Sequence, residues 1–216
     1  MARVGLFGGT FNPVHLAHLR AAEEVREQCA LDRVEFVLSA SPPHKPGTDL
    51  APVAHRRRML ALALAENRAF VLNTSEIERP GRSYSIDTIR ACQAREPGAE
   101  LTFILGADAF AEIATWKDYT DIFALCDLCV ISRPGMTAVP LPIAVEKSFC
   151  YDPARAVYAH RSGHAVFFLS VTALMISASD IRQRQADGRS IRYLVPGAVG
   201  DYIAEHRLYA GRPAAP

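Results

Sequence analysis

Residues 8–18 read GGTFNPVHLAH, and they directly follow an apolar run at residues 4–7. The run is typical of a buried strand, and the two glycines at its end let a ligand approach the backbone closely. Residues 14–29 carry apolar side chains at spacings of three and four, which predicts a helix with Asn12 as its N-cap and Pro13 at its first position. A strand that runs through a glycine turn into a helix is the opening unit of an α/β fold.

Strand-like and helix-like runs alternate along the rest of the chain. Further strands are predicted at residues 34–38, 70–73, 101–105, 128–131 and 165–169, and helices at 53–66, 85–95, from Ser177 to a stop at Gly188, and at 199–208. Such alternation is typical of a doubly wound α/β fold, in which helices cover both faces of a mostly parallel sheet. Residues 136–163 favour irregular structure with one strand near 145–149. We expect one domain over residues 1–210, with 177–210 as its helical C-terminal part and 211–216 as a frayed tail.

The composition of the 216 residues is that of an ordinary globular protein, since half of them are hydrophobic and 22% are charged. The 24 Lys and Arg residues are balanced by 23 Asp and Glu residues, so the net charge of +1 lacks the basic excess of nucleic-acid binders. No apolar run approaches the ~20 residues that span a bilayer, and the N-terminus has no signal-peptide layout. We therefore expect a cytoplasmic protein without a nucleic-acid or membrane partner, and a homo-oligomer stays open.

Two further segments are interpreted as structural. Cys126 and Cys129 have CxxC spacing, but no second pair of this kind and no histidine pair accompanies them, so buried free thiols are the better interpretation. The run Arg56-Arg57-Arg58 is most simply the solvated face of a helix.

His15 and His18 lie three residues apart at the start of the first predicted helix, so both imidazoles should project from one face. A helix N-terminus after a glycine turn offers unpaired N–H groups and a partial positive charge to an anion. Two imidazoles beside a phosphate can donate hydrogen bonds to the charge that grows in a transition state. The alternatives are two ordinary helix histidines or a zinc site, for which a third ligand is not nearby. The glycine patterns of dinucleotide-binding and P-loop enzymes do not follow this strand.

Ligands of doubly wound sheets bind beyond the carboxyl ends of the strands, where this sequence turns polar. Ser177 opens a helix with hydroxyl and N–H groups, and Arg182 follows one turn later with a guanidinium that can grip phosphate oxygens. The plain alternative is a helix cap with a solvated arginine. Asp108 follows a predicted strand, where it can accept hydrogen bonds from a ribose or cap the next helix.

The segment at residues 8–18 resembles the histidine-any-glycine-histidine motif of a superfamily of nucleotidyltransferases, with Ala17 in place of the motif's glycine. Four further segments are similar, in order, to those of bacterial nicotinate-nucleotide adenylyltransferases: PPHK at 42–45, YSIDT at 84–88, GAD at 106–108 and ISASDIR at 176–182. The chain therefore resembles that family over nearly its full length. The resemblance implies a Rossmann-like nucleotidyltransferase fold. It also implies an enzyme of NAD biosynthesis that transfers the adenylyl group of ATP to nicotinate mononucleotide, giving deamido-NAD and pyrophosphate.

The same resemblance implies roles for single residues. The catalytic side chains that hold phosphates would be His15, His18, Lys45 and Arg182. ATP would also contact Gly8, Gly9, Thr10, Phe11, Gly106, Asp108, Arg133, Ser177 and Ser179. Nicotinate mononucleotide would meet Ser85, Trp116 and Lys117, with the indole on the pyridine ring and backbone N–H groups on the carboxylate. Mg²⁺ would be bound mainly through the phosphates of ATP, without a cage of protein carboxylates.

Three alternatives stay open at this point. The substrate could be nicotinamide mononucleotide, phosphopantetheine or a cytidylyl acceptor, although the segments at Ser85 and Trp116 favour a pyridine nucleotide. The chain could also be a nucleotide-sensing module without turnover, which Ala17 supports and against which His15, His18, Lys45 and Arg182 argue. A dinucleotide-using oxidoreductase is disfavoured because its glycine fingerprint is missing.

Overall fold

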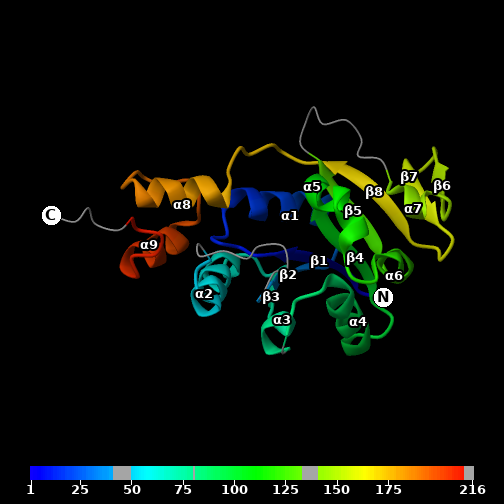
Figure 1. Cartoon of the computed structure of the whole chain (residues 1–216), viewed down its shortest axis with the longest axis horizontal. Helices are drawn as coiled ribbons and strands as arrows, with labels where there is room; N and C mark the ends of the chain where they lie inside the picture. Colours follow the sequence, from blue (N-terminus) through cyan, green and yellow to red (C-terminus); the bar gives the residue numbers. More distant parts are fainter. Residues whose placement is uncertain (41–49, 80, 133–140, 212–216) are drawn as a thin grey trace.

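The computed structural model describes residues 1–40, 50–79, 81–132 and 141–211 of the chain (Figure 1). The strands in these residues are β1 (Arg3–Gly9), β2 (Arg33–Leu38), β3 (Phe70–Asn73), β4 (Glu100–Gly106), β5 (Asp127–Ser132), β6 (Phe149–Asp152), β7 (Val157–His160) and β8 (Ala165–Ser170). They form one sheet in the order β3-β2-β1-β4-β5-β8-β7-β6. Neighbours from β3 to β8 in this order pair in parallel, and β7 and β6 are added antiparallel.

The order of the strands reverses between β1 and β4. The chain moves outward from β1 through β2 to β3, then returns to place β4 on the other side of β1. The connections that leave β1 and β4 therefore diverge, and such a switch point leaves a crevice at the carboxyl ends of the strands. The predicted doubly wound, mostly parallel α/β fold is confirmed.

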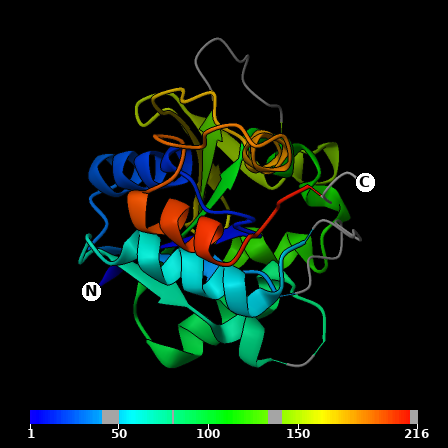
Figure 2. The same cartoon turned by 90° about the vertical axis from the view of Figure 1, so that its left-hand side faces the viewer.

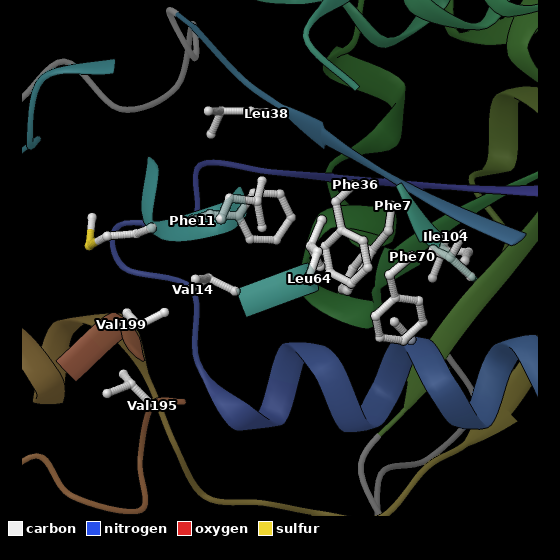
Figure 3. Close-up of a cluster of buried hydrophobic side chains, with 14 of the residues drawn as sticks. Phe7, Phe11, Val14, Phe36, Leu38, Leu64, Phe70, Ile104, Val195 and Val199 are labelled. Atoms are coloured by element: carbon white, nitrogen blue, oxygen red, sulfur yellow. The ribbon is translucent and has the colours of Figure 1, made fainter. Parts of the chain in front are cut away.

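Helices cover both faces of the sheet (Figure 1). They are α1 (Leu16–Gln28), α2 (Val53–Leu64), α3 (Ser75–Glu78), α4 (Ser85–Arg95), α5 (Ala107–Ala111), the 3-10 turn η1 (Ile113–Thr115), α6 (Tyr119–Leu125), α7 (Ile143–Glu146), α8 (Ala178–Ala186) and α9 (Gly197–Glu205). Successive side chains of β1 point to opposite faces, so Phe7 joins the hydrophobic cluster under α1 and α2, shown in Figure 3, and Leu6 joins the cluster under α4 and α6. Burial on both faces explains why β1 reads as a continuous apolar run.

The C-terminal part lies at the end of the molecule opposite the β6–β7 hairpin (Figure 1). Helix α9 lies beside α2 (Figure 2), and its Val199 packs in the same cluster as Val14 (Figure 3). The predicted ends of the preceding helix are confirmed. The Oγ of Ser177 accepts the N–H of Asp180 at 3.1 Å, and Gly188 follows α8 with a φ of 68°.

The prediction for residues 136–163 is wrong in its described part, 141–163. Residues 145 and 146, the start of the predicted strand near 145–149, end α7, and β6 begins only at Phe149. The segment then forms a hairpin, because β7 pairs antiparallel with β8 and offers its other edge to β6. This pairing depends on a neighbouring strand edge that local sequence does not reveal. The short helix α3 was not predicted either.

The prediction for the start of the first helix is also wrong. Helix α1 begins at Leu16, and its N-cap is His15 in an extended conformation. Asn12 is not the cap, because its side-chain oxygen accepts hydrogen bonds from the N–H of Ala51 and the hydroxyl of Tyr209 instead. The Asn12–Pro13 peptide bond is cis.

Three smaller expectations have different outcomes. Cys126 and Cys129 are free and buried, which confirms the structural interpretation of this pair. The described helices include none that is long and apolar enough to cross a membrane. Residues 212–216 of the predicted tail lie outside the described residues.

Candidate active site

A cavity of about 900 Å³ opens where the strand order reverses. Gly9 ends β1, Gly106 ends β4, and both residues line the cavity, so it occupies the crevice in which doubly wound sheets bind ligands. The first residues of α1 and α8 line it as well. The cavity therefore gathers most of the residues to which the sequence assigned ATP binding or catalysis: Gly9, Thr10, Phe11, His15, His18, Gly106, Asp108, Ser177, Ser179 and Arg182.

His15 and His18 form a stacked pair in the wall of this cavity. Their ring centroids are 3.6 Å apart and their planes are 22° from parallel. The rings of Phe7 and Phe11 meet the His18 ring edge-on, with centroids at 6.2 and 5.1 Å. The expectation that both imidazoles share one face is confirmed, and the aromatic neighbours hold the orientation of His18.

The hydrogen bonds of this pair define what each ring can donate. Nδ1 of His18 accepts the backbone N–H of His15 at 3.2 Å, so the proton of the His18 ring lies on Nε2. His15 is 5% exposed, and burial lowers the pKa of its imidazole to about 4, which leaves it neutral at pH 7. Its Nδ1 has no hydrogen-bond partner among the described residues. The cavity wall thus presents two neutral imidazoles, one of which has a buried nitrogen unpaired.

The start of α8 forms another part of the cavity wall. The hydroxyls of Ser177 and Ser179 lie 3.0 Å apart there, and Arg182 is half-buried one turn later. Asp108 is exposed at the cavity in the first turn of α5 and is not the cap of that helix, because Gly106 is. The cavity thus combines hydroxyls, a guanidinium and a carboxylate with the imidazole pair.

Several cavity residues were missed by sequence reasoning. The carbonyl oxygen of Asn12 accepts a hydrogen bond from Nη1 of Arg182 at 2.9 Å, which joins α8 to the turn after β1. Residues 171–174 and 176 also line the cavity. Their position after β8, at the carboxyl end of a parallel strand, was the available indication, whereas nothing local pointed to the contact of Asn12.

Arg56 corrects the prediction of a solvated arginine run. Its side chain is 1% exposed, and its guanidinium donates to the carbonyl oxygens of Thr10, Ser39, Ala40 and Ala51 at 2.7–3.1 Å. It thereby ties the turn after β1 to the end of β2 and the start of α2. An indication was present, because Arg56 precedes the apolar residues 59 and 60 by three and four positions and so shares their buried face.

The residues assigned to the pyridine nucleotide lie together, but outside the lining of this cavity. Lys117 lies 3.2 Å from the carboxylate of Asp87 and over the ring of Tyr84, so the segments that contain Ser85 and Trp116 are neighbours. Trp116 is half-buried and meets Phe103 edge-on. Gly8 faces the same side, since a β-carbon on Gly8 would lie 3.6 Å from the Phe103 ring. This group therefore lies on the α4 side of the sheet, next to the cavity end of β1.

Known proteins resemble the chain in both sequence and fold. Residues 6–184 match the family model described as cytidylyltransferase-like. A curated protein of Geobacter sulfurreducens, named "probable nicotinate-nucleotide adenylyltransferase", is 52% identical over 96% of this chain and 98% of its own length. The chain belongs to the nicotinate-nucleotide adenylyltransferase family. Another relative of the same name, from Pelobacter propionicus, is 48% identical over 98% of this chain and 100% of its own length.

Solved structures agree with this membership at the level of the fold. The Plasmodium falciparum nicotinic acid mononucleotide adenylyltransferase complexed with NaAD superposes with a TM-score of 0.72, covering 97% of this chain and 98% of that one. The same protein complexed with APC gives a TM-score of 0.70. Because the sequence identity is 16% in both cases, the likeness shows the fold alone. The expected Rossmann-like nucleotidyltransferase fold is confirmed.

As a member of the nicotinate-nucleotide adenylyltransferase family, the protein is an enzyme of the nucleotidyltransferase class. Two of its assigned site residues, Lys45 and Arg133, lie outside the described residues. Within the described chain, no three His, Cys, Asp or Glu side chains gather as a metal site, and Asp108 is the carboxylate on the cavity wall. This donor set fits a Mg²⁺ ion that arrives with the phosphates of ATP.

Proposed function

We propose that this member of the nicotinate-nucleotide adenylyltransferase family transfers the adenylyl group of ATP to nicotinate mononucleotide in NAD biosynthesis. An oxygen of the mononucleotide phosphate attacks the α-phosphorus of ATP in line. The new P–O bond forms as the bond to pyrophosphate breaks, and deamido-NAD results. The observation that carries the proposal is the His15–His18 pair in the wall of the switch-point cavity, in a chain 52% identical to a protein of that name.

The protein's part in this reaction is positioning and charge stabilisation, because the transfer needs no covalent enzyme intermediate. The neutral rings of His15 and His18 donate hydrogen bonds to phosphate oxygens whose negative charge grows in the transition state. Arg182 and Lys45 neutralise the leaving pyrophosphate. Arg182 is supported by its place on the cavity wall, and Lys45 by its motif alone.

The remaining cavity residues would bind ATP. The backbone around Gly8, Gly9 and Gly106 lets the nucleotide approach closely, and Asp108 accepts hydrogen bonds from ribose hydroxyls. The start of α8 offers N–H groups and hydroxyls to the phosphates. Further contacts are proposed for the residues that the family motifs assign to ATP: Thr10, Phe11, Arg133, Ser177 and Ser179.

The mononucleotide would bind on the α4 side, where the Ser85 and Trp116 segments meet. The indole of Trp116 stacks on the pyridine ring, and backbone N–H groups of Ser85, Trp116 and Lys117 meet the nicotinate carboxylate. An amide would present its own N–H groups to these donors, so the acid form is preferred.

Mg²⁺ is proposed to enter with ATP. Bound to the triphosphate, it supplies charge neutralisation at the phosphate oxygens. The protein would hold the ion through the phosphates rather than through its own carboxylates, since Asp108 is assigned to the ribose.

The test is to mix the full chain with ATP, Mg²⁺ and one mononucleotide at a time, and to measure pyrophosphate release and product mass. Nicotinate mononucleotide should give deamido-NAD, and nicotinamide mononucleotide should give little product. Faster turnover of the amide would overturn the assigned acceptor. ATP binding without any release of pyrophosphate would instead indicate a nucleotide-sensing module without turnover.

The other expectations stay predictions. They are a cytoplasmic location and the lack of nucleic-acid and membrane partners. The oligomeric state stays open, and sedimentation of the purified chain would determine it.

A further inference from the structure

Tyr209, near the end of the described chain, reaches back to the turn that follows β1. Its hydroxyl donates to Oδ1 of Asn12 at 2.8 Å, across 197 residues of sequence. The same oxygen accepts the backbone N–H of Ala51 at 3.1 Å. Asn12 is 7% exposed, and the Tyr209 ring packs against the hydrophobic cluster that contains Phe7. Two segments far apart in sequence therefore fix the side chain of Asn12.

The backbone of Asn12 connects this contact to the cavity. Its carbonyl oxygen accepts Nη1 of Arg182 at 2.9 Å, and Arg182 lines the cavity. A guanidinium is planar and rigid, so a hydrogen bond at one N–H restricts the directions of its other donors. The position of Asn12 therefore limits where the remaining N–H groups of Arg182 point.

Tyr209 keeps its proton in this setting. Burial raises the pKa of its phenol, while the nearby guanidinium groups of Arg182 and Arg56 act in the opposite direction and are outweighed. A protonated phenol can donate to the Asn12 oxygen, whereas a phenolate could only accept. Asn12 is thus held without a negative charge beside Arg182, whose own charge stays available for an anion.

We propose that Tyr209 is a positioning residue for adenylyl transfer. Its hydroxyl fixes Asn12, and Asn12 directs the guanidinium of Arg182 toward the phosphates of ATP. This inference rests on the proposed function, since it takes those phosphates as the ligand of Arg182. It gives the segment after α9 a part in ATP binding, although no described residue of that segment lines the cavity. The plain alternative is that Tyr209 only anchors the end of the chain.

The test measures steady-state kinetics of Tyr209→Phe in the full chain, with separate KM values for ATP and nicotinate mononucleotide. Phenylalanine keeps the ring and its packing and removes only the hydroxyl. We expect the KM for ATP to rise about fivefold, the fold-change of one neutral hydrogen bond, and the KM for the mononucleotide to stay within about twofold. The matched control is Tyr193→Phe, because Tyr193 is 86% exposed and also has a positive φ. It should change neither KM.

Two further variants test the route through Asn12 and Arg182. In an Arg182→Gln background, Tyr209→Phe should change the KM for ATP by less than about twofold, because the guanidinium that it directs is gone. Asn12→Ala removes the acceptor and should raise the KM for ATP at least as much as Tyr209→Phe. An unchanged KM for ATP in Tyr209→Phe, or an equal rise in the Arg182→Gln background, would overturn the proposal in favour of a plain anchor.

Failure of the proposed function is distinguishable from failure of this inference. A wild-type chain that forms no deamido-NAD contradicts the reaction, whereas calorimetric binding of a non-hydrolysable ATP analogue still tests Tyr209. We expect about fivefold weaker binding of the analogue to Tyr209→Phe than to wild type. Equal affinities of the two proteins would overturn the positioning role.

Discussion

The ring of Phe11 lies directly against the α-carbon of Gly9. A β-carbon added to Gly9 would lie 2.7 Å from Cζ of Phe11, closer than nonbonded carbon atoms approach. Phe11 cannot simply move away, because its ring also packs on Phe7 and Phe36 and meets the ring of His18 edge-on. The missing side chain at the end of β1 thus sets the place of an aromatic ring that in turn orients His18.

Gly9→Ala should therefore disturb both stability and activity. Forcing the Phe11 ring outward is an overpacking change, and we expect the free energy of unfolding to fall by about 2 kcal/mol. The displaced ring shifts His18, so kcat/KM should fall roughly tenfold or more. Chemical denaturation and pyrophosphate release measure the two effects. Gly200→Ala is the control, since a β-carbon there meets only Val195 at 3.6 Å inside α9 and should leave both quantities unchanged or raise stability slightly.

His18→Ala should lower kcat by about a hundredfold, the scale of one lost hydrogen-bond donor to a transition-state oxygen. Because Nδ1 of His18 accepts the backbone N–H of His15, the ring proton lies on Nε2, and the variant removes this donor. The rate of pyrophosphate release at saturating substrates is the measurement. His164→Ala, a change outside the cavity, should keep the wild-type rate, and a His18→Ala enzyme with the same rate would remove His18 from the mechanism.

The buried imidazole of His15 should make the protein less stable in mild acid. The unfolded chain takes up a proton at His15 near pH 6.5, whereas burial lowers the pKa in the folded protein to about 4. Between these values the unfolded state binds more protons, so the free energy of unfolding falls as the pH drops, by about 2 kcal/mol between pH 7.5 and 5. Urea denaturation of the wild type at the two pH values measures the sum over all groups.

The variant His15→Gln isolates the part that belongs to His15. Its loss of stability between pH 7.5 and 5 should be smaller than that of the wild type by about 2 kcal/mol, because glutamine does not titrate. His206→Gln, at the exposed end of α9, should follow the wild type. Equal losses in the wild type and His15→Gln would contradict the assigned cause.

Arg56→Ala should lower the free energy of unfolding by about 3 kcal/mol, because it leaves four carbonyl oxygens without their described donor. Thermal and urea unfolding measure this loss. Arg57→Ala and Arg58→Ala change exposed neighbours on the same helix and should stay within about 0.5 kcal/mol of wild type. A loss of similar size in all three variants would show that the substitutions weaken helix α2 itself, and would contradict a specific role of the buried guanidinium.

The strands and longer helices could be predicted because their causes act locally. A parallel strand buried on both faces needs continuous apolar side chains, which residues 4–7 and 101–105 supply. Ser177 caps α8 by accepting the N–H of a residue three positions later, so this contact can be predicted from the local sequence. Residues 15 and 18 meet for a similarly local reason, since His15 is the N-cap of α1 and His18 is its third residue, one turn away.

The incorrect predictions concern groups whose partners come from far along the chain. Asparagine is a residue type that often caps helices, but the side-chain oxygen of Asn12 accepts hydrogen bonds from the N–H of Ala51 and the hydroxyl of Tyr209 instead. Arginine is usually a surface residue, yet the guanidinium of Arg56 is buried because it donates hydrogen bonds to four carbonyl oxygens from three segments. The β6–β7 hairpin depends on the free edge of β8.

The sequence by itself determined the alternation of strands and helices, the order of the motifs and the adenylyltransferase family to which they belong. Each element and each motif depends on residues within a few positions of one another, and the order of the motifs can be read directly along the chain. Only the tertiary structure decided that β1 and β4 are neighbours, that Gly9 and Gly106 therefore border one cavity, and that Tyr209 reaches Asn12 beside it. Those relationships arise when distant segments pack to bury apolar surface and to satisfy buried polar groups, and local spacing carries no record of that choice.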